Sequence, residues 1–385
     1  MTQLHEPERP RRHLAAVPAA EVGTATDDIS GVLKLNDLAE ETPRVVVTVP
    51  GFVERFRKNV SFIDGLLAIY FALMLFAVAF GTGPDHDLCT RRVIIDIVLF
   101  AIGLALTRGG ILKHGTLLNE CVYRATIFAS VFLTYFQLRD ILPAVSGRAV
   151  DADILAFDLK VFGVEPSLAW DRFVNPTTTE WFAFFYFGYF FILILFVLPM
   201  VFNAHNELRV AHFTLGMVMV YCTGHLVYML VPGWGPYKYL AGNFEHPLQG
   251  GLFWSLVKAT VDAGGAQKDI FPSLHTAAPT YLAIFSYLHR KTLPFKFVWP
   301  VIAFCATQII LATMFLRWHY LVDILAGLTL ATTSALLSYK IIGWETKRRR
   351  AQKAEPIFRI CDYPWEKPGA RSAGAADDNV VTGSV

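Results

Sequence analysis

Two histidine-containing segments of the chain carry residue types that can handle phosphate. The first is Phe271-Pro272-Ser273-Leu274-His275, where a polar loop gives way to an apolar stretch. We expect a helix to begin here with Pro272 in its first turn, because proline there gives up an N–H that has no intrahelical partner. The remaining free N–H groups, the helix dipole and the Ser273 hydroxyl then form an anion site beside His275.

The second segment runs from Arg317 to Asp323 and leads into the last long apolar stretch. His319 and Asp323 are four residues apart, so on a helix they share one face and the carboxylate can accept a hydrogen bond from the imidazole. Asp323 lies in otherwise apolar sequence, where an ionised group is costly without a partner. An imidazole oriented by a carboxylate is the general form of an activated base or nucleophile. We therefore expect a nitrogen of His319 to be free to attack.

Two basic residues are candidates for holding the phosphate beside Ser273. Lys238 ends the loop sequence Pro-Gly-Trp-Gly-Pro-Tyr-Lys, and Arg317 precedes His319 by two residues. Phosphoryl transfer chiefly needs positive charge at the equatorial oxygens, so Ser273, Lys238 and Arg317 form the predicted phosphate-binding set. We expect no metal and no other cofactor, because the five cysteines are scattered without paired spacing and acidic loop residues such as Asp151 are usually solvated.

Membrane helices are the elements that must position these residues. The 385-residue chain is 54% hydrophobic and 17% charged, with a mean hydropathy of +0.43, which is typical of a membrane protein. A net charge of +2 is too small to indicate a basic surface that binds nucleic acid, so we expect no nucleic-acid partner. About eight apolar stretches are long enough to cross roughly 30 Å of hydrocarbon. They are 61–81, 92–107, 121–142, 181–202, 212–231, 271–288, 297–316 and 320–342. The predicted fold is an all-α, polytopic transmembrane helix bundle.

The composition divides the chain into one membrane domain and two tails. Residues 1–45 hold too few large apolar side chains to build a core and are predicted to be a disordered cytoplasmic tail. The membrane domain covers 46–345, with a catalytic core at about 151–343. Residues 346–385 are predicted to be a flexible cytoplasmic tail.

Charge in the loops orients the predicted bundle. Cytoplasmic loops carry an excess of Lys and Arg. Here these residues precede the first stretch and follow the second, fourth, sixth and eighth, at Arg55, Arg57, Lys58, Arg108, Lys113, Arg209, Arg290, Lys291, Lys296 and 347–350. We therefore expect both termini to be cytoplasmic and both histidine segments to lie on the extracytoplasmic side. The outer loop before the fourth stretch is acid-rich and contains a predicted short interfacial helix at 154–162. Composition favours a bacterial inner membrane.

At these residues the sequence resembles the type 2 phosphatidic acid phosphatase superfamily. Pro272, Ser273 and His275 match its second motif, Pro-Ser-x-His, and His319 and Asp323 match the end of its third, His-x-x-x-Asp. The wording of the two matches is most similar to the inositol phosphorylceramide synthase branch, the aureobasidin-resistance type, and less so to the sphingomyelin synthases. The similarity spans roughly residues 151–343.

The resemblance implies a role for each matched residue. It assigns His319 as the nucleophile that forms a phosphohistidine, Asp323 as the group that orients it, and His275 as the acid that protonates the leaving group. Two features depart from the phosphatase pattern. The first motif, Lys-x6-Arg-Pro, is absent, and Thr313 stands where an arginine is expected six residues before the nucleophile. Both departures favour the synthase-like branch over a plain phosphatase.

Three functions are compatible with these observations. The first is a metal-independent membrane enzyme that transfers a phosphoryl or phospho-alcohol group, such as inositol phosphate, from a phospholipid donor to a lipid or polyol alcohol. The second is a lipid phosphate phosphatase that uses water as the acceptor. The third is a polytopic transporter, for which intramembrane ionisable residues would mark a path. The candidate residues instead gather at one outer surface, which argues against transport.

Overall fold

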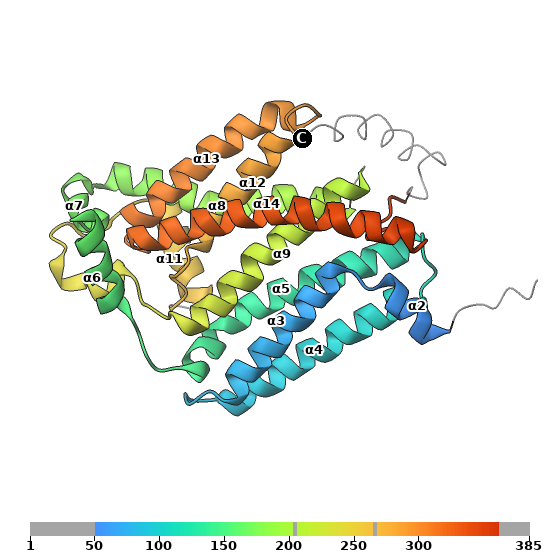
Figure 1. Ribbon diagram of the computed structural model, residues 1–385. Coiled ribbons are helices and arrows are strands. Elements are labelled where there is room, and N and C mark those ends of the chain that lie inside the picture. The colour runs from blue at the N-terminus through green and yellow to red at the C-terminus, as the bar shows by residue number, and fades with distance from the viewer. Residues whose placement is uncertain (1–50, 203–205, 265–267, 362–385) are drawn as a thin grey trace, which may run out of the picture. The chain divides into compact units, whose positions relative to one another are not determined.

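The computed structural model describes residues 51–202, 206–264 and 268–361. These residues form α-helices α2 to α14 and two short 3-10 helices, and they contain no strand (Figure 1). The predicted all-α, polytopic bundle is confirmed. The predicted tail at 1–45 lies outside the described residues.

Each of the eight predicted apolar stretches lies in a helix, apart from a few residues at its ends. These helices are α3 (Phe62–Ala79), α4 (His86–Arg108), α5 (Leu117–Val145), α8 (Pro176–Phe202), α9 (Glu207–Leu230), α12 (Leu274–Leu288), α13 (Phe295–Phe315) and α14 (Leu321–Ala351). Six of them are long and apolar enough to cross a membrane by length and composition. The exceptions are α4, which contains several charged residues, and α12, whose 15 residues extend only about 22 Å.

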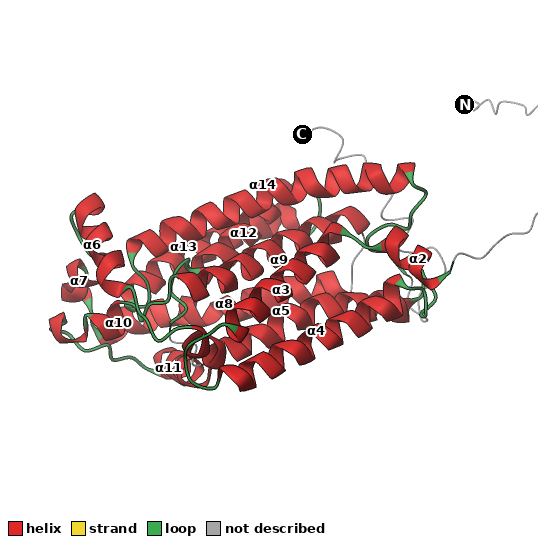
Figure 2. Ribbon diagram, turned by 60° about the horizontal axis from the view of Figure 1, so that its bottom comes forward, coloured by secondary structure: helices red, strands yellow, loops and turns green. Residues whose placement is uncertain are grey.

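Short helices gather at the two ends of the bundle. They are α2 (Phe52–Asn59), α6 (Asp151–Phe162), α7 (Pro166–Ala169), α10 (Pro236–Tyr239) and α11 (Leu252–Gly264). Figures 1 and 2 show α6, α7, α10 and α11 at one end and α2 at the other. The predicted interfacial helix corresponds to α6, which stops where Gly163 adopts a left-handed φ of 73°. Helix α11 was not predicted from the sequence.

Helix α9 occupies the centre of the bundle, and it is the most buried of the six long apolar helices. Small residues let neighbours approach it closely, as is usual between membrane helices. A Cβ on Gly216 would lie only 2.1 Å from the Tyr281 hydroxyl of α12. That hydroxyl donates to the His212 carbonyl of α9 at 2.8 Å. Helices α9 and α12 are therefore held at a fixed depth relative to one another.

The end of the bundle that carries α2 is closed by buried ion pairs. Arg349 donates to Glu345 at 2.8 Å and to the carbonyls of Asn59 and Val60, and Arg108 pairs with Asp64 at 3.2 Å. The prediction of a flexible tail from residue 346 is therefore wrong for its first part. Helix α14 continues to Ala351, and Phe358 is buried. Arg349 fixes the end of α14, and the backbone of residues 357–359 is held by Arg108, Arg124 and Glu120. Residues 362–385 are not among those described.

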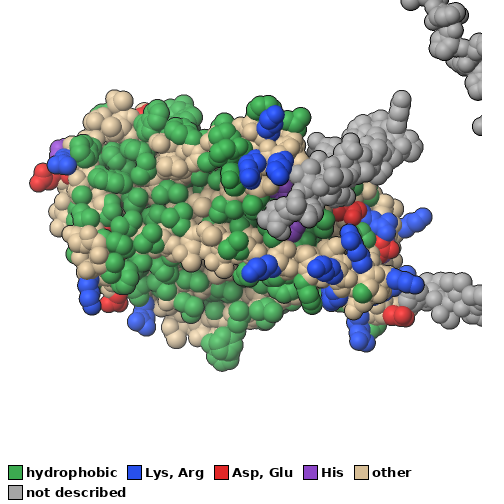
Figure 3. Space-filling view, turned by 45° about the horizontal axis from the view of Figure 1, so that its top comes forward, with side chains coloured by type: hydrophobic (Ala, Val, Ile, Leu, Met, Phe, Trp, Pro, Cys, Tyr) green, Lys and Arg blue, Asp and Glu red, His purple; other side chains and the backbone are tan. Residues whose placement is uncertain are grey.

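The surface shows how charge is distributed along the bundle. In Figure 3, hydrophobic side chains cover the middle of the visible face, while Lys and Arg side chains gather toward the end that bears α2. An apolar middle with charged ends is the pattern expected of helices that cross a bilayer.

Replacing Arg349 by alanine is expected to lower stability, because it removes the main partner of the fully buried Glu345 carboxylate. Losing one member of a buried ion pair costs about 3 kcal/mol. The measurement is the thermal unfolding midpoint in detergent, with Arg350→Ala, an exposed neighbour, as the control. Equal midpoints for the two variants would contradict the packing of this segment.

Candidate active site

His319 lies in the turn between α13 and α14, at the end of the bundle that carries α6, α7 and α11. The backbone N–H groups of Trp318 and His319 both donate to the Thr313 carbonyl, at 2.9 and 3.2 Å. The preceding Arg317 adopts a positive φ of 68°, which is unfavourable for a residue with a Cβ. The last turn of α13 thus holds His319 in a tight and partly strained connection.

Asp323 lies close to the His319 ring, but not by the route predicted. Because α14 begins at Leu321, His319 precedes the helix and does not share a helical face with Asp323. The Asp323 carboxylate accepts the Tyr320 N–H at 2.9 Å and lies 3.4 Å from His319 Nδ1. At this distance the imidazole and the carboxylate can form an ion pair, but their atoms are not positioned for a hydrogen bond. The carboxylate therefore caps α14 and faces the imidazole at the same time.

His275 lies in the first turn of α12, and this helix also starts later than predicted. Ser273 is its N-cap, so Pro272 stands before the helix and not in its first turn. The Ser273 hydroxyl is fully buried and accepts the Thr276 N–H at 3.2 Å. This hydroxyl acts as a helix cap and Ser273 does not line the cavity described below, so phosphate binding by Ser273 stays a prediction.

A direct backbone contact joins the two histidine segments. The Ser273 N–H donates to the Asp323 carbonyl at 3.0 Å. Gly327 of α14 permits this approach, because a Cβ there would lie 2.6 Å from the Ser273 carbonyl oxygen. The starts of α12 and α14 are thereby fixed side by side.

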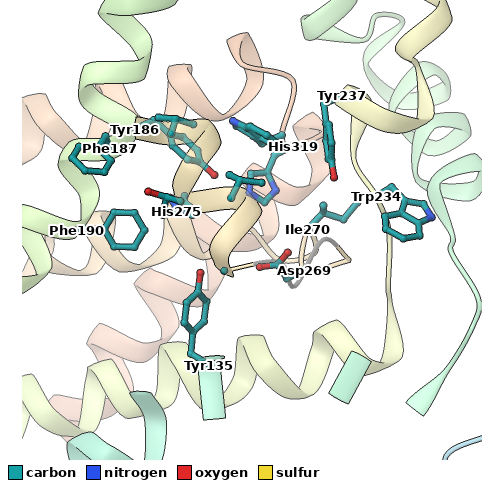
Figure 4. A pocket seen from close by; sticks show the side chains of 15 residues that line it. Tyr135, Tyr186, Phe187, Phe190, Trp234, Tyr237, Asp269, Ile270, His275 and His319 are labelled. Carbon is teal, nitrogen blue, oxygen red and sulfur yellow. The ribbon is translucent and has the colours of Figure 1, made fainter. Parts of the chain in front are cut away.

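The structure brings the two predicted histidines together over one cavity. The ring centroids of His275 and His319 are 6.4 Å apart, and Tyr186 of α8 stacks on His275 at 4.4 Å. Figure 4 shows both imidazoles among aromatic side chains. The cavity has a volume of about 80 Å³, which has room for a small polar group. It is lined by Tyr135, Tyr186, Phe187, Phe190, Trp234, Tyr237, Val257, Thr260, Val261, Gly264, Asp269, Ile270, His275, Trp318 and His319.

Several buried nitrogens at this cavity lack a hydrogen-bond partner among the described residues. They are His275 Nε2, His319 Nδ1 and Trp318 Nε1. Buried polar atoms are nearly always paired in folded proteins, so a cluster of unpaired ones calls for an explanation. A ligand carrying acceptor oxygens would satisfy His275 Nε2 and Trp318 Nε1, whereas His319 Nδ1 faces the Asp323 carboxylate at 3.4 Å.

Asp269 is a lining residue that the sequence did not single out. Burial lowers the pKa of His319 to about 4, while the negative charge of Asp269 and a backbone hydrogen bond at Ile270 act to raise it. Burial in turn raises the pKa of Asp269. Its position two residues before Phe271 was the available signal, but only the fold shows that it faces His319.

The two predicted basic residues lie outside the cavity. Arg317 pairs with Asp171 at 2.7 Å, and Lys238 Nζ lies 3.2 Å from the centroid of the Trp234 ring. The described residues that line the cavity include no Lys or Arg. Phosphate binding by Lys238 and Arg317 stays a prediction, and what the structure shows is an Arg317 already engaged by a carboxylate.

Acidic residues of the outer loop brace the turns around the site. Asp158 of α6 is fully buried and accepts the N–H groups of Leu321 and Val322, at 2.7 and 3.1 Å. Asp151 accepts the Gly235 N–H at 2.8 Å and the Tyr320 hydroxyl at 3.1 Å. The interpretation of Asp151 as a solvated loop residue is therefore wrong, because its carboxylate satisfies backbone groups that the loops leave unpaired.

Comparison with known proteins bears directly on this part of the chain. Residues 153–337 match the family model described as PAP2 superfamily. The matched segment contains His275, His319, Asp323 and Asp269, whereas α2 to α5 precede it. No curated protein and no solved structure matched the chain. The PAP2 match indicates a lipid enzyme of the phosphatase or phosphotransferase type.

Replacing Asp158 by alanine is expected to destabilise the start of α14, because two N–H groups and the positive end of the helix dipole lose their acceptor. The cost is about 1–2 kcal/mol of unfolding free energy. Thermal unfolding in detergent measures it. Asp153→Ala is the matched control, since Asp153 is exposed on the same helix. If the two variants unfold at the same temperature, Asp158 does not brace the helix.

Proposed function

We propose that this protein transfers a phosphoryl or phospho-alcohol group between membrane lipids through a phosphohistidine at His319. One observation carries the proposal. Two imidazoles from separate motifs meet 6.4 Å apart over one buried cavity, and both lie in the segment that matches the PAP2 superfamily.

The proposed reaction has two steps with the bonds balanced. In the first, the His319 nitrogen remote from Asp323 forms a bond to phosphorus, the bond from phosphorus to the leaving alkoxide breaks, and His275 gives that oxygen a proton. In the second, His275 takes the proton of an acceptor hydroxyl, whose oxygen displaces His319 from phosphorus. Asp323, 3.4 Å from Nδ1, stabilises the positive charge that His319 gains in the first step.

The phosphoryl oxygens need donors, and aromatic residues are the candidates at this cavity. The Trp318 N–H is buried without a partner among the described residues, and the tyrosines that line the cavity carry hydroxyls. In a site with little water, such preorganised donors stabilise charge more strongly than they would in solution. Arg317 then acts as a positioning residue, because its ion pair with Asp171 holds the turn that carries His319.

The acceptor distinguishes a transferase from a phosphatase. We favour transfer to an alcohol of a lipid or polyol, as in the movement of inositol phosphate onto a lipid hydroxyl. The support is that the Lys-x6-Arg-Pro motif is missing and that Thr313 stands where the phosphatase pattern has an arginine. We further propose that the termini are cytoplasmic and the site extracytoplasmic, since the loops with excess Lys and Arg lie at the opposite end.

The test is to supply the purified protein in detergent with a phospholipid labelled in its phosphate, with and without a lipid alcohol or inositol. Transfer predicts label in a new phospholipid only when the alcohol is present. Label released into water whether or not the alcohol is present identifies a hydrolase; it leaves as inorganic phosphate from a monoester or as a phospho-alcohol from a diester. An intact substrate under all conditions contradicts both functions.

His319→Ala is expected to abolish turnover of every substrate, because the nucleophile is gone.

His275→Asn is expected to lower the rate with an alkyl leaving group by roughly 100-fold or more. With a nitrophenyl leaving group, which departs without a proton, the loss is much smaller. Steady-state rates on the two ester types measure this difference. Equal losses on both esters would remove His275 from the acid role.

Asp269→Asn is expected to shift the pH dependence of kcat/KM. His319 must be neutral to attack, and the charge of Asp269 raises its pKa. Without that charge the pKa of His319 falls, so the neutral form persists at lower pH and the acid limb moves to lower pH. Asp262→Asn, an exposed neighbour outside the cavity, is the control. An acid limb that moves to higher pH would overturn this account of the electrostatics.

A further inference from the structure

A second, larger cavity lies next to the candidate active site, within the apolar part of the bundle. It has a volume of about 400 Å³ and is walled by α5 on one side, α8 on the other and α9 behind. We call it the α5–α8 groove. Tyr135 and Phe190 line both this groove and the histidine cavity, so the two spaces adjoin.

The groove runs from the histidine cavity toward the end of the bundle that carries α2, and the buried Arg124 and Phe358 lie at its far end. Along α5 its lining extends from Tyr135 to Arg124, which corresponds to about 16 Å of helix. This is close to half of the ~30 Å hydrocarbon core, the depth of one leaflet. At this far end Arg124 donates to the carbonyls of Val201 and Arg359, which fixes it in place.

One long side of the groove faces the surface. Its rim residues Phe132, Phe136 and Ile194 are 48%, 52% and 52% exposed. They come from the two facing walls, α5 and α8. A ligand in the bilayer can therefore enter sideways between them.

We propose that the α5–α8 groove holds one hydrocarbon chain of the lipid whose phosphate enters between His275 and His319. This inference rests on the proposed function. The groove is apolar, has the depth of one leaflet and opens where the phosphate is expected, so a lipid with its headgroup at the histidines directs a chain into it. Helix α5 lies outside the segment that matches the PAP2 superfamily, so this wall comes from the helices that precede that segment.

The groove selects a chain by shape more than by affinity. A chain leaving the bilayer gains little from burial, because lipid tails are as apolar as the groove itself. Because the far end of the groove at Arg124 lies at a fixed depth, the groove discriminates between hydrocarbon chains by their length. A chain that just reaches Arg124 fits, whereas a longer chain must bend out between the rim residues. The α5–α8 groove is therefore a specificity-determining site.

Two substitutions that shorten the groove test the inference. Val197→Trp fills it about 10 Å below Phe190, and Val131→Trp fills it about 6 Å below Tyr135. The controls are Leu195→Trp on α8 and Leu133→Trp on α5, which are 63% and 42% exposed and do not line the groove. The substrates share one headgroup and carry chains of ~16 carbons, which fill a leaflet, or ~8 carbons. A water-soluble ester without a chain is the third substrate.

Val197→Trp is expected to lower kcat/KM for the long chain about tenfold and to leave the short chain within about twofold. Val131→Trp is expected to lower kcat/KM for both chains. Neither variant should change turnover of the chainless ester, which also shows that each variant is folded. The controls should behave as the wild type on all three substrates.

The possible failures are separable. If the wild type turns over none of the substrates, the proposed function fails. If the wild type is active but the groove variants affect long, short and chainless substrates alike, or match their controls, the groove does not hold the substrate chain. A lipid that copurifies in the groove without any change in chain preference on substitution also overturns the inference, because it is then a bystander.

Discussion

The hydrogen bond from the Ser273 N–H to the Asp323 carbonyl joins two segments that lie 50 residues apart in the chain. It forms because Gly327 has no side chain to separate α12 from α14 at that point. The positions of His275 and His319 follow from it, since each residue lies within four positions of one partner in this bond. The two imidazoles face one another because two helix starts share a backbone contact, and neither histidine needs a direct contact with the other.

Helix starts and turns at this end leave backbone N–H groups unpaired, and carboxylates satisfy them. Asp158 accepts from the start of α14, Asp151 from the turn at Gly235, and Asp323 from Tyr320. Unpaired buried N–H groups are costly, so each carboxylate stabilises the turn that it caps. Of these three acids, Asp323 also faces the His319 ring at 3.4 Å, so in the proposed reaction it would stabilise positive charge on that imidazole. Asp323 thus contributes both to the start of α14 and to the proposed chemistry.

The bundle pairs a small polar cavity with a long apolar groove, and the two meet at Tyr135 and Phe190. Such a junction suits a molecule with a charged headgroup and a hydrocarbon chain. The polar cavity comes mostly from the segment that matches the PAP2 superfamily, and one wall of the groove comes from α5, which precedes that segment. In this interpretation the matched core supplies the phosphorus chemistry, and the N-terminal helices contribute to the choice of lipid.

Hydrophobic runs and motif spacing determined the helical class, the eight helical stretches and the candidate histidines, because these features are local in sequence. The tertiary structure decided the rest. It set the first residues of α12 and α14 at Leu274 and Leu321, made Ser273 a helix cap, paired Arg317 with Asp171 and placed Asp269 beside His319. It also packed the chain as far as Phe358 through the buried Arg349, Arg108 and Arg124. Each of these outcomes depends on a partner distant in the chain, and a buried polar group takes whichever partner the fold brings within reach.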